Sequence, residues 1–313
     1  MSKFLGLNRV CVPLSLDCDL SCRYCYRAAG RIPVVPDFND LMREYLGQLD
    51  PTKTQALVAS GGEPLLHFDK VKELFSYAPK DQHKKVMTNG LNLTQEIVDY
   101  LNENKVETWV SHDGDATEWL RGVDVLRDEE QLELIRKIDH LTIACACTAK
   151  NPDPYKNYLQ SKAILGRDFY FHYNALFVEK FLHPELVEGF DYGAWQAGVL
   201  HCEMLDLDWH NPIPHGYRGV GVNVLPNGDL TGMENIHHKY GTVLSTREEV
   251  MAKQREFGDL KACDNTDCLM YKNCKTQGQY RSDHFCAARL KKGIARAFIN
   301  IREREKDVTE LCL

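Results

Sequence analysis

The chain has 313 residues, of which 43% are hydrophobic and 27% are charged, and its formal net charge at pH 7 is −7. This length accommodates one large α/β domain, or a large domain followed by a small one. The negative charge argues against nucleic acid as the main partner, and the lack of an apolar run of about 18 residues in the sequence argues against a membrane span.

The first predicted strand, residues 9–16, leads directly into a loop rich in cysteine. The short apolar stretch before this loop is not typical of a signal peptide, which predicts a cytoplasmic protein. The loop places Cys18, Cys22 and Cys25 in the spacing C-x3-C-x2-C. Thiolates favour zinc or an iron–sulfur cluster, and a structural zinc normally takes four protein ligands. Three thiolates therefore indicate a four-iron cluster with one open iron; the alternative is a zinc ion completed by a distant histidine.

Apolar, β-rich runs then alternate with helical segments. The predicted strands are residues 55–60, 84–89, 107–113, 141–149 and 168–177, and the predicted helices are residues 69–78, 94–105 and 129–140. Asp69 and Thr94 are the predicted N-caps of the first two helices. Strands that alternate with helices of about a dozen residues predict βαβ units and a parallel sheet. Six such strands fit a partial (β/α)6 TIM-like barrel better than a full eight-fold barrel.

Three of these strands end in short polar segments. They are SGGEP at residues 60–64, MTNG at residues 87–90 and SHDG at residues 111–114. In parallel barrels the functional groups collect in the loops that follow the strands, at one end of the barrel. We therefore expect these three segments and the cysteine loop to meet and form a site.

The cysteine spacing, with Tyr24 before the third cysteine and Tyr26 after it, resembles the radical S-adenosylmethionine (SAM) superfamily. The resemblance implies that the open iron of a [4Fe-4S] cluster binds the methionine amine and carboxylate of SAM. It also implies that electron transfer from the cluster cleaves the sulfonium and gives a 5′-deoxyadenosyl radical, which abstracts hydrogen from a substrate. On the same grounds Tyr24 is predicted to lie among the cofactor-binding residues.

The GGEP segment resembles the family segment that holds the methionine amino group of SAM. It consists of Gly61, Gly62, Glu63 and Pro64. Glycine lets the backbone approach a ligand closely, and a carboxylate suits an ammonium group. A plain turn is the alternative for this segment if it is taken alone.

Two other strand ends are similar to ribose-facing polar positions of related enzymes. These are Asn89 and Ser111, and for each the alternative is an ordinary residue at the end of a strand. The run from Ser111 to Gly122 also resembles the S-x-D-G…R-G pattern of the peptide-modifying branch, through Ser111, Asp113, Gly114, Arg121 and Gly122.

The last part of the chain resembles the SPASM and twitch extensions of radical SAM enzymes. Residues 222–245 predict a β-hairpin with PNGD in its turn. The family usually has a cysteine just after this turn, where the present chain has residues 231–234 without one. Four later cysteines have the spacing C-x4-C-x5-C-x11-C: Cys263, Cys268, Cys274 and Cys286. Outside a secretory context they predict one auxiliary [4Fe-4S] cluster, with a structural zinc as the alternative.

The predicted domains are a radical SAM partial barrel, residues 1–215, and a SPASM- or twitch-like domain, residues 216–313. Two further cysteines, Cys147 and Cys202, are candidate hydrogen donors to a substrate radical. Packing is the alternative for both, because a buried free cysteine normally behaves as a small hydrophobic residue. Cys147 shares a strand face with Cys145, two positions away.

The resemblance implies an oxidoreductase or maturase that acts on a ribosomally made peptide, by crosslinking, epimerisation or oxidation. A small metabolite is the alternative substrate, and a non-catalytic iron–sulfur or zinc protein is the remote alternative. About ten residues precede the first strand, so a leader peptide is expected to need a separate leader-binding protein or the extension. A flavodoxin- or ferredoxin-type protein is the expected electron donor. The hairpin at residues 220–243 is the predicted exposed edge for an extended peptide.

Overall fold

The structure is a computed structural model, and it describes eight segments of the chain. They are residues 9–25, 34–50, 56–79, 82–175, 184–186, 188–205, 222–232 and 237–257. All structural statements below concern these residues.

The described strands form one nine-stranded sheet in the order β6-β5-β4-β3-β2-β1-β7-β8-β9. The strands are β1 (Arg9–Ser15), β2 (Ala56–Gly61), β3 (His83–Thr88), β4 (Glu107–Ser111), β5 (Leu141–Cys147), β6 (Tyr170–Ala175), β7 (Val222–Val224), β8 (Asp229–Gly232) and β9 (Lys239–Thr242). Neighbouring strands from β1 to β6 are all parallel. This arrangement confirms the predicted parallel sheet.

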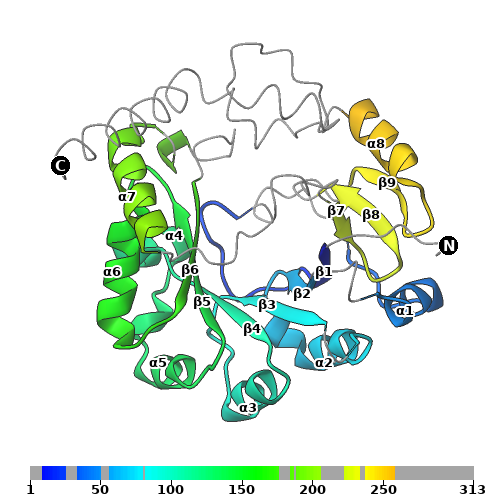
Figure 1. Cartoon of the computed structure of the whole chain (residues 1–313), viewed down its shortest axis with the longest axis horizontal. Coiled ribbons are helices and arrows are strands. Elements are labelled where there is room, and N and C mark those ends of the chain that lie inside the picture. Colours follow the sequence, from blue (N-terminus) through cyan, green and yellow to red (C-terminus); the bar gives the residue numbers. More distant parts are fainter. Residues whose placement is uncertain are drawn as a thin grey trace, which may run out of the picture.

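A helix follows each of the six parallel strands, because neighbouring parallel strands are joined by crossover connections that usually contain an α-helix. The helices are α1 (Asp40–Gly47), α2 (Phe68–Ser76), α3 (Gln95–Glu103), α4 (Thr117–Arg121), α5 (Glu129–Arg136), α6 (Pro154–Leu165), α7 (Tyr192–Met204) and α8 (Arg247–Glu256). Figure 1 shows the strands as an open arc with α2, α3, α5 and α6 on its outer side. The sheet and its helices therefore form a partial barrel.

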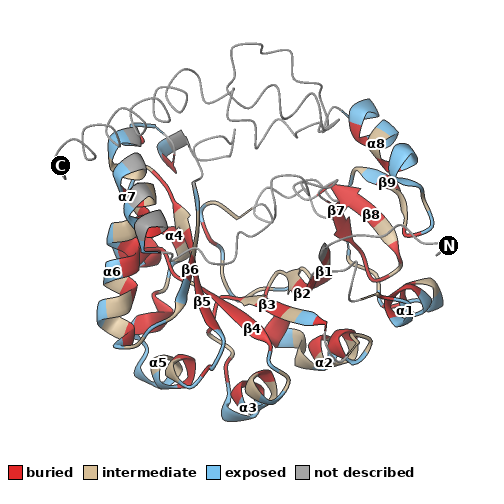
Figure 2. Cartoon of the chain, viewed as in Figure 1, coloured by how far each residue is buried: buried red, intermediate tan, exposed pale blue. Residues whose placement is uncertain are grey.

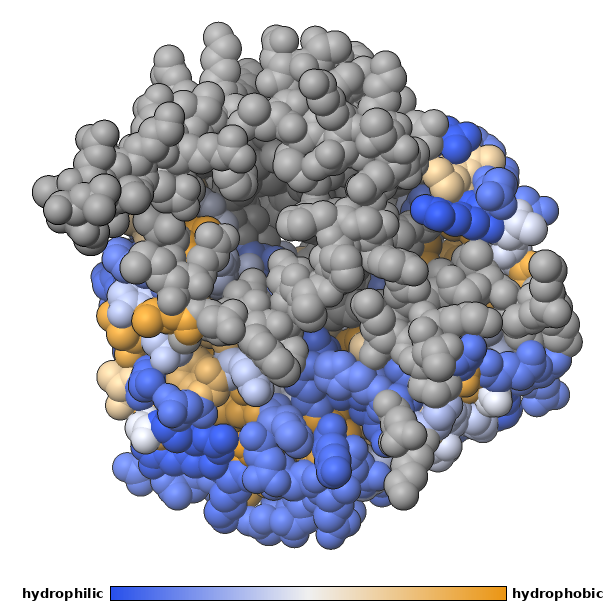
Figure 3. Space-filling model, in the orientation of Figure 1, coloured by the Kyte–Doolittle hydropathy of each residue, from blue (hydrophilic) through white to orange (hydrophobic). Residues whose placement is uncertain are grey.

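The core lies between the sheet and the outer helices. Val86, Val110 and Ile143 are fully buried on that face, together with Leu101 of α3 and Ile135 of α5. Figure 2 shows buried residues along the strands and exposed residues on the outer sides of the helices. In Figure 3 hydrophilic residues cover most of the described surface on the side of α3 and α5. Helices α2, α3 and α5 are thus amphipathic, as helices that cover one face of a sheet typically are.

The N-cap prediction is confirmed at one helix and wrong at the other. The Thr94 side chain accepts a hydrogen bond from the backbone N–H of Ile97 at 3.3 Å and caps α3. Asp69 instead lies in the first turn of α2, after the N-cap residue His67. The reason is the 3-10 turn at Pro64–His67, which runs directly into α2, so the side-chain cap comes earlier, from Glu63.

The predicted hairpin is present and belongs to the same sheet as the barrel. β7 pairs with β1 in parallel at Cys11 and Asn223, and β8 pairs antiparallel with β7 and β9. The turn contains Gly228, whose φ of 84° lies in the left-handed region that favours glycine. β7 and β8 are each paired on both sides, whereas β9 ends the sheet order of the described strands, so β9 is the part of the hairpin left for the predicted exposed edge, which stays a prediction.

The predicted boundary between residues 215 and 216 lies outside the described residues, so the division into two domains stays a prediction. No helix in the described part of the chain is both long enough and apolar enough to cross a membrane.

Candidate active site

The loop after β1 carries the three predicted cluster ligands. Cys22 is buried, whereas Cys18 and Cys25 are half-buried, and all three are free thiols. The backbone N–H of Cys25 donates to the carbonyl of Cys22 at 3.0 Å, which closes a tight turn between these two residues. Burial raises the pKa of the Cys22 thiol, while the charge of Arg121 lowers it. The loop thus presents three thiols from one compact segment.

The donor set suits an iron–sulfur cluster. Within the described residues, no three His, Cys, Asp or Glu side chains are grouped closely enough to hold a single metal ion. A four-iron cluster takes its thiolates on separate iron atoms, so the three thiols of this loop fit it. The backbone N–H of Leu20 lies 3.5 Å from Cys18 Sγ, and Asn89 Nδ2 lies 3.9 Å from it. Such N–H groups near sulfur are known to tune cluster potentials.

The segment after β2 folds against the cysteine loop. The backbone N–H groups of Gly62 and Glu63 donate to the carbonyls of Ser15 and Asp17, both at 2.7 Å. A Cβ atom at Gly61 would lie 2.2 Å from the Ser15 carbonyl oxygen, and one at Gly62 would lie 2.1 Å from that of Asp17. Both glycines are therefore required by the contact between the two loops, a reason different from the close approach of a ligand that we expected.

Glu63 lies at the centre of the strand ends and is only 1% exposed. Its Oε1 accepts from the Thr88 hydroxyl at 2.8 Å and from the Leu65 N–H at 3.0 Å, and its Oε2 accepts from the Asn89 N–H at 2.7 Å. Burial raises the pKa of Glu63 to about 7, although these hydrogen bonds lower it. Pro64 is also buried and begins the 3-10 turn that follows. Glu63 thus ties the ends of β2 and β3 together.

Asn89, at the end of β3, uses its side chain within the protein. Its Nδ2 donates to Asp19 Oδ1 at 2.6 Å, and its Oδ1 accepts from the Leu91 N–H at 2.9 Å. Asp19 also accepts from Asn92 Nδ2 at 2.7 Å. These bonds fit the alternative for Asn89, an ordinary turn residue at the end of a strand. The contact of Asn89 with the ribose stays a prediction. Our reading of the sequence missed Asp19 and Thr88, although Asp19 stands inside the cysteine motif.

Ser111, the other predicted ribose neighbour, ends β4 in register with Ala144 of β5 and is half-buried. Successive side chains of a strand point to opposite faces, so Ser111 lies on the face of Trp109, away from Val110 and the helices. This is the inner face of the arc. This position fits the predicted contact of Ser111 with the ribose, and that contact stays a prediction.

Asp113, just after β4, joins β4 to the cysteine loop. The Tyr24 hydroxyl donates to Asp113 Oδ2 at 2.8 Å, and Arg121 Nε donates to the same oxygen at 2.6 Å. Burial raises the pKa of Tyr24 well above its usual range. The Tyr24 side chain therefore contacts Asp113, and its place among the cofactor-binding residues stays a prediction. The S-x-D-G…R-G pattern corresponds to this pair of charged side chains.

The two candidate hydrogen donors lie in the core. Cys147 Sγ lies 3.9 Å from Cys145 Sγ and 3.6 Å from Asn157 Nδ2 of α6, and Cys147 is fully buried. Since Cys147 shares a strand face with Ile143, it faces the helices and not the inner face of the arc. Cys202 lies in α7 and is also fully buried in the core. These positions support the packing alternative for both residues.

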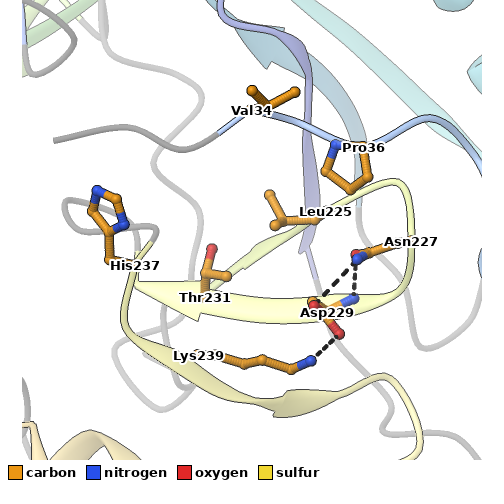
Figure 4. Close-up of a pocket in the computed structure, with 8 residues that line it drawn as sticks. All are labelled: Val34, Pro36, Leu225, Asn227, Asp229, Thr231, His237 and Lys239. Carbon is orange, nitrogen blue, oxygen red and sulfur yellow. Dashed lines mark hydrogen bonds and ion pairs between the residues drawn. The ribbon is translucent and has the colours of Figure 1, made fainter. Parts of the chain in front are cut away.

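A shallow pocket lies on the inner face of the hairpin and has a volume of about 380 Å³. Figure 4 labels its eight lining residues, which come from the hairpin, its turn and residues 34–36. Lys239 Nζ and Asp229 Oδ1 form an ion pair at 2.7 Å within it. Thr231, also in the lining, is 2% exposed and stands in register with Asn223, which itself pairs with Cys11 of β1. The pocket therefore shares the inner face of the arc with the barrel strands.

The four predicted auxiliary ligands, Cys263, Cys268, Cys274 and Cys286, lie outside the described residues. The auxiliary cluster therefore stays a prediction.

Among curated proteins, none matches the sequence of this chain. Among solved structures, the fold is similar to that of native anSMEcpe with bound AdoMet, with a TM-score of 0.62, 18% identity and coverage of 96% of this chain and 99% of that chain. It is also similar to native anSMEcpe with bound AdoMet and Cp18Cys peptide, with a TM-score of 0.60, 19% identity and the same coverage. Streptococcus suis SuiB bound to precursor peptide SuiA has a TM-score of 0.52 at 16% identity, with coverage of 72% of this chain and 60% of that chain.

At these identities the structural likenesses show the fold alone. The model of the Radical SAM superfamily matches residues 12–137, a range that contains the cysteine loop, GGEP and the ends of β3 and β4. With this match and the partial barrel, the chain belongs to the radical SAM superfamily and is a radical SAM enzyme.

Proposed function

We propose that this enzyme modifies a ribosomally made peptide after hydrogen abstraction, by crosslinking, epimerisation or oxidation. The observation that carries the proposal is the likeness, over 96% of the chain, to a structure that holds both AdoMet and a peptide. Because one fold can serve many substrates, this likeness supports the substrate class by analogy.

The inner face of the arc supports the proposal. The hairpin extends the barrel sheet beyond β1, so the wall that faces the substrate is longer than six strands. The pocket on this wall offers a paired lysine and aspartate, a threonine and a histidine, which suit the mixed polar groups of a peptide. A peptide residue next to the one that reacts is the proposed occupant.

In this proposal Cys18, Cys22 and Cys25 hold the catalytic cluster, which when bound supplies the electron for reductive cleavage of SAM. Glu63 receives the methionine ammonium group. A carboxylate has about four acceptor positions, and three donors already occupy Glu63, so Oε2 retains one position for an ammonium. Asn89 and Ser111 face the ribose in this scheme.

The proposal extends to an auxiliary [4Fe-4S] cluster held by Cys263, Cys268, Cys274 and Cys286. Its partners are a flavodoxin- or ferredoxin-type electron donor and, for a peptide with a leader, a separate leader-binding protein.

The test uses the anaerobically reconstituted full chain with SAM, a reductant and short peptides encoded next to its gene. We expect 5′-deoxyadenosine to form together with a change in the mass of one peptide, measured by mass spectrometry. The variant with Cys18, Cys22 and Cys25 replaced by Ala is the control and should give neither product. Formation of 5′-deoxyadenosine that responds to a small metabolite and to none of the peptides would overturn the peptide assignment.

A further inference from the structure

Three side chains contact one another beside the cysteine loop: Tyr24, which belongs to that loop, Asp113, which follows β4, and Arg121 of α4. Asp113 Oδ2 accepts from the Tyr24 hydroxyl at 2.8 Å and from Arg121 Nε at 2.6 Å. Arg121 Nη2 also donates to Asp113 Oδ1 at 3.3 Å, and the guanidinium carbon lies 5.2 Å from the centre of the Tyr24 ring. Asp113 is fully buried, and the Arg121 side chain is 11% exposed.

The hydrogen-bonding capacity of the Asp113 carboxylate is fully used. Besides the three bonds from Tyr24 and Arg121, its Oδ1 accepts from the Ala146 N–H of β5 at 2.7 Å. Four donors match the roughly four lone-pair positions of an ionised carboxylate. The Asp113 backbone is fixed as well, because its N–H donates to the Thr117 hydroxyl and its carbonyl accepts from Asn151. Asp113 is therefore placed as a support and not as a base toward substrate.

A second residue of the same loop is held by the same helix. The backbone N–H of Arg23 donates to the Leu120 carbonyl at 2.8 Å, and Arg23 Nε donates to the Trp119 carbonyl at 2.9 Å. Arg23 and Tyr24 are the two residues between Cys22 and Cys25. The turn that carries these two thiols is thus anchored on α4 through the main chain and on Asp113 through Tyr24.

The one positive and the one negative side chain of this group, Arg121 and Asp113, form an ion pair. The Arg121 guanidinium is largely shielded from water and lies over the Tyr24 ring, in the turn between Cys22 and Cys25, and the Asp113 carboxylate is its bonded partner. In such a place a charge acts over a longer range than in water. Net charge and hydrogen bonds near the sulfurs are among the factors that set cluster potentials.

We propose that Tyr24, Asp113 and Arg121 form a positioning group for the catalytic cluster. Tyr24 fixes the turn with Cys22 and Cys25, and Asp113 cancels the charge of Arg121 beside the cluster and so holds its midpoint potential. This inference rests on the proposed ligands Cys18, Cys22 and Cys25, and does not depend on the identity of the substrate.

The experiment is a redox titration of the reconstituted full chain without substrate, followed by electron paramagnetic resonance (EPR). The catalytic cluster is identified as the signal that changes when SAM is added. Asp113→Asn leaves Arg121 unbalanced and should raise the midpoint potential, because positive charge favours the reduced cluster. Arg121→Gln leaves Asp113 unbalanced and should lower it, and the double variant should return near the wild-type value.

Tyr24→Phe tests positioning apart from charge. It removes one hydrogen bond and no charge, so we expect little shift in potential. We expect an altered EPR line shape and faster alkylation of the loop thiols in the cluster-free protein. Unchanged line shape and unchanged alkylation would overturn the positioning role of Tyr24.

A matched control is the buried pair of Lys85 and Glu107, whose charged atoms lie 3.2 Å apart in the same sheet. Glu107 precedes Asp113 by six residues, which is about 20 Å along an extended strand. Glu107→Gln should leave the potential unchanged. The proposal is overturned if Asp113→Asn and Arg121→Gln move the potential in the same direction, or no more than Glu107→Gln does.

If the single variants lose iron, their potentials cannot be compared, and the double variant, in which neither charge remains, then tests the proposal. It should retain iron and a potential near the wild-type value, and its failure in either respect overturns charge balance as the role of Asp113. The iron content of the wild-type protein tests the assignment of the cluster ligands independently of this proposal. The mass of the peptide product tests the proposed function independently of it.

Discussion

The protonation of the buried Glu63 side chain is coupled to the stability of the folded chain. It is 1% exposed, and burial raises its pKa to about 7, while the unfolded chain keeps the ordinary value near 4.5. Between these two values the folded state binds more protons than the unfolded state. The contribution of Glu63 is therefore fully present below about pH 4.5 and is lost as the pH rises through about 7.

We therefore predict that the free energy of unfolding of the cluster-free protein falls between pH 5 and pH 7 by up to about 3 kcal/mol through Glu63. Glu63→Gln cannot ionise and should lack this component. Urea denaturation of both proteins at several pH values measures it as the difference between the two profiles. If the free energy of unfolding changed with pH equally in both proteins, Glu63 would not titrate in this range.

Gly62 is a second residue at which packing decides the outcome of a substitution. A Cβ at Gly62 would lie 2.1 Å from the Asp17 carbonyl oxygen, whereas a Cβ at Gly47 in α1 meets nothing within 4 Å. We expect Gly62→Ala to destabilise the chain by about 1–3 kcal/mol through overpacking. Gly47→Ala, the control, should be neutral or stabilising by up to about 1 kcal/mol. Equal stabilities of the two variants in denaturation would contradict this account.

At the scale of an element, helix α3 begins at a cap that local sequence provides. Thr94 accepts from the Ile97 N–H, whereas Asp69 of α2 caps nothing and pairs at the surface with Lys72 at 2.8 Å. Thr94→Ala should cost about 1 kcal/mol of stability. Asp69→Ala should cost less than about 0.5 kcal/mol, as exposed ion pairs usually do. Thermal or urea denaturation compares the two, and a larger loss for Asp69→Ala would reverse the assignment.

At the scale of the whole molecule, the two cysteine groups at opposite ends of the chain should behave as independent sites. After anaerobic reconstitution we expect about eight iron atoms per chain, four for each proposed cluster. Replacing Cys18, Cys22 and Cys25 with Ala should remove about half the iron and all cleavage of SAM. Cys263→Ala should lose iron and leave the spectrum of the first cluster intact.

Iron analysis, EPR and 5′-deoxyadenosine formation measure these outcomes. Cleavage of SAM by the triple variant would contradict the assignment of the first site. Zinc in place of iron in the Cys263 group would contradict the auxiliary cluster.

How far the sequence predicts the site depends on whether a feature is local. The spacing of Cys18, Cys22 and Cys25 and the cap at Thr94 involve residues a few positions apart. The meeting of the loops follows from strand and helix alternation, because parallel strands end at one edge. The start of α2 could not be predicted from Asp69, since the preceding 3-10 turn and the Glu63 cap moved it.

The sequence by itself determined the superfamily, the parallel sheet and the segments that meet at the site, because motif spacing and hydrophobic periodicity are properties of neighbouring residues. Only the tertiary structure decided the partner of Tyr24, which is Asp113, 89 positions away, and the pairing of β7 with β1. It also decided that Cys147 faces the helices, since the buried face of a strand depends on what packs against it. Contacts between distant residues depend on the packing of whole elements, and no local pattern encodes them.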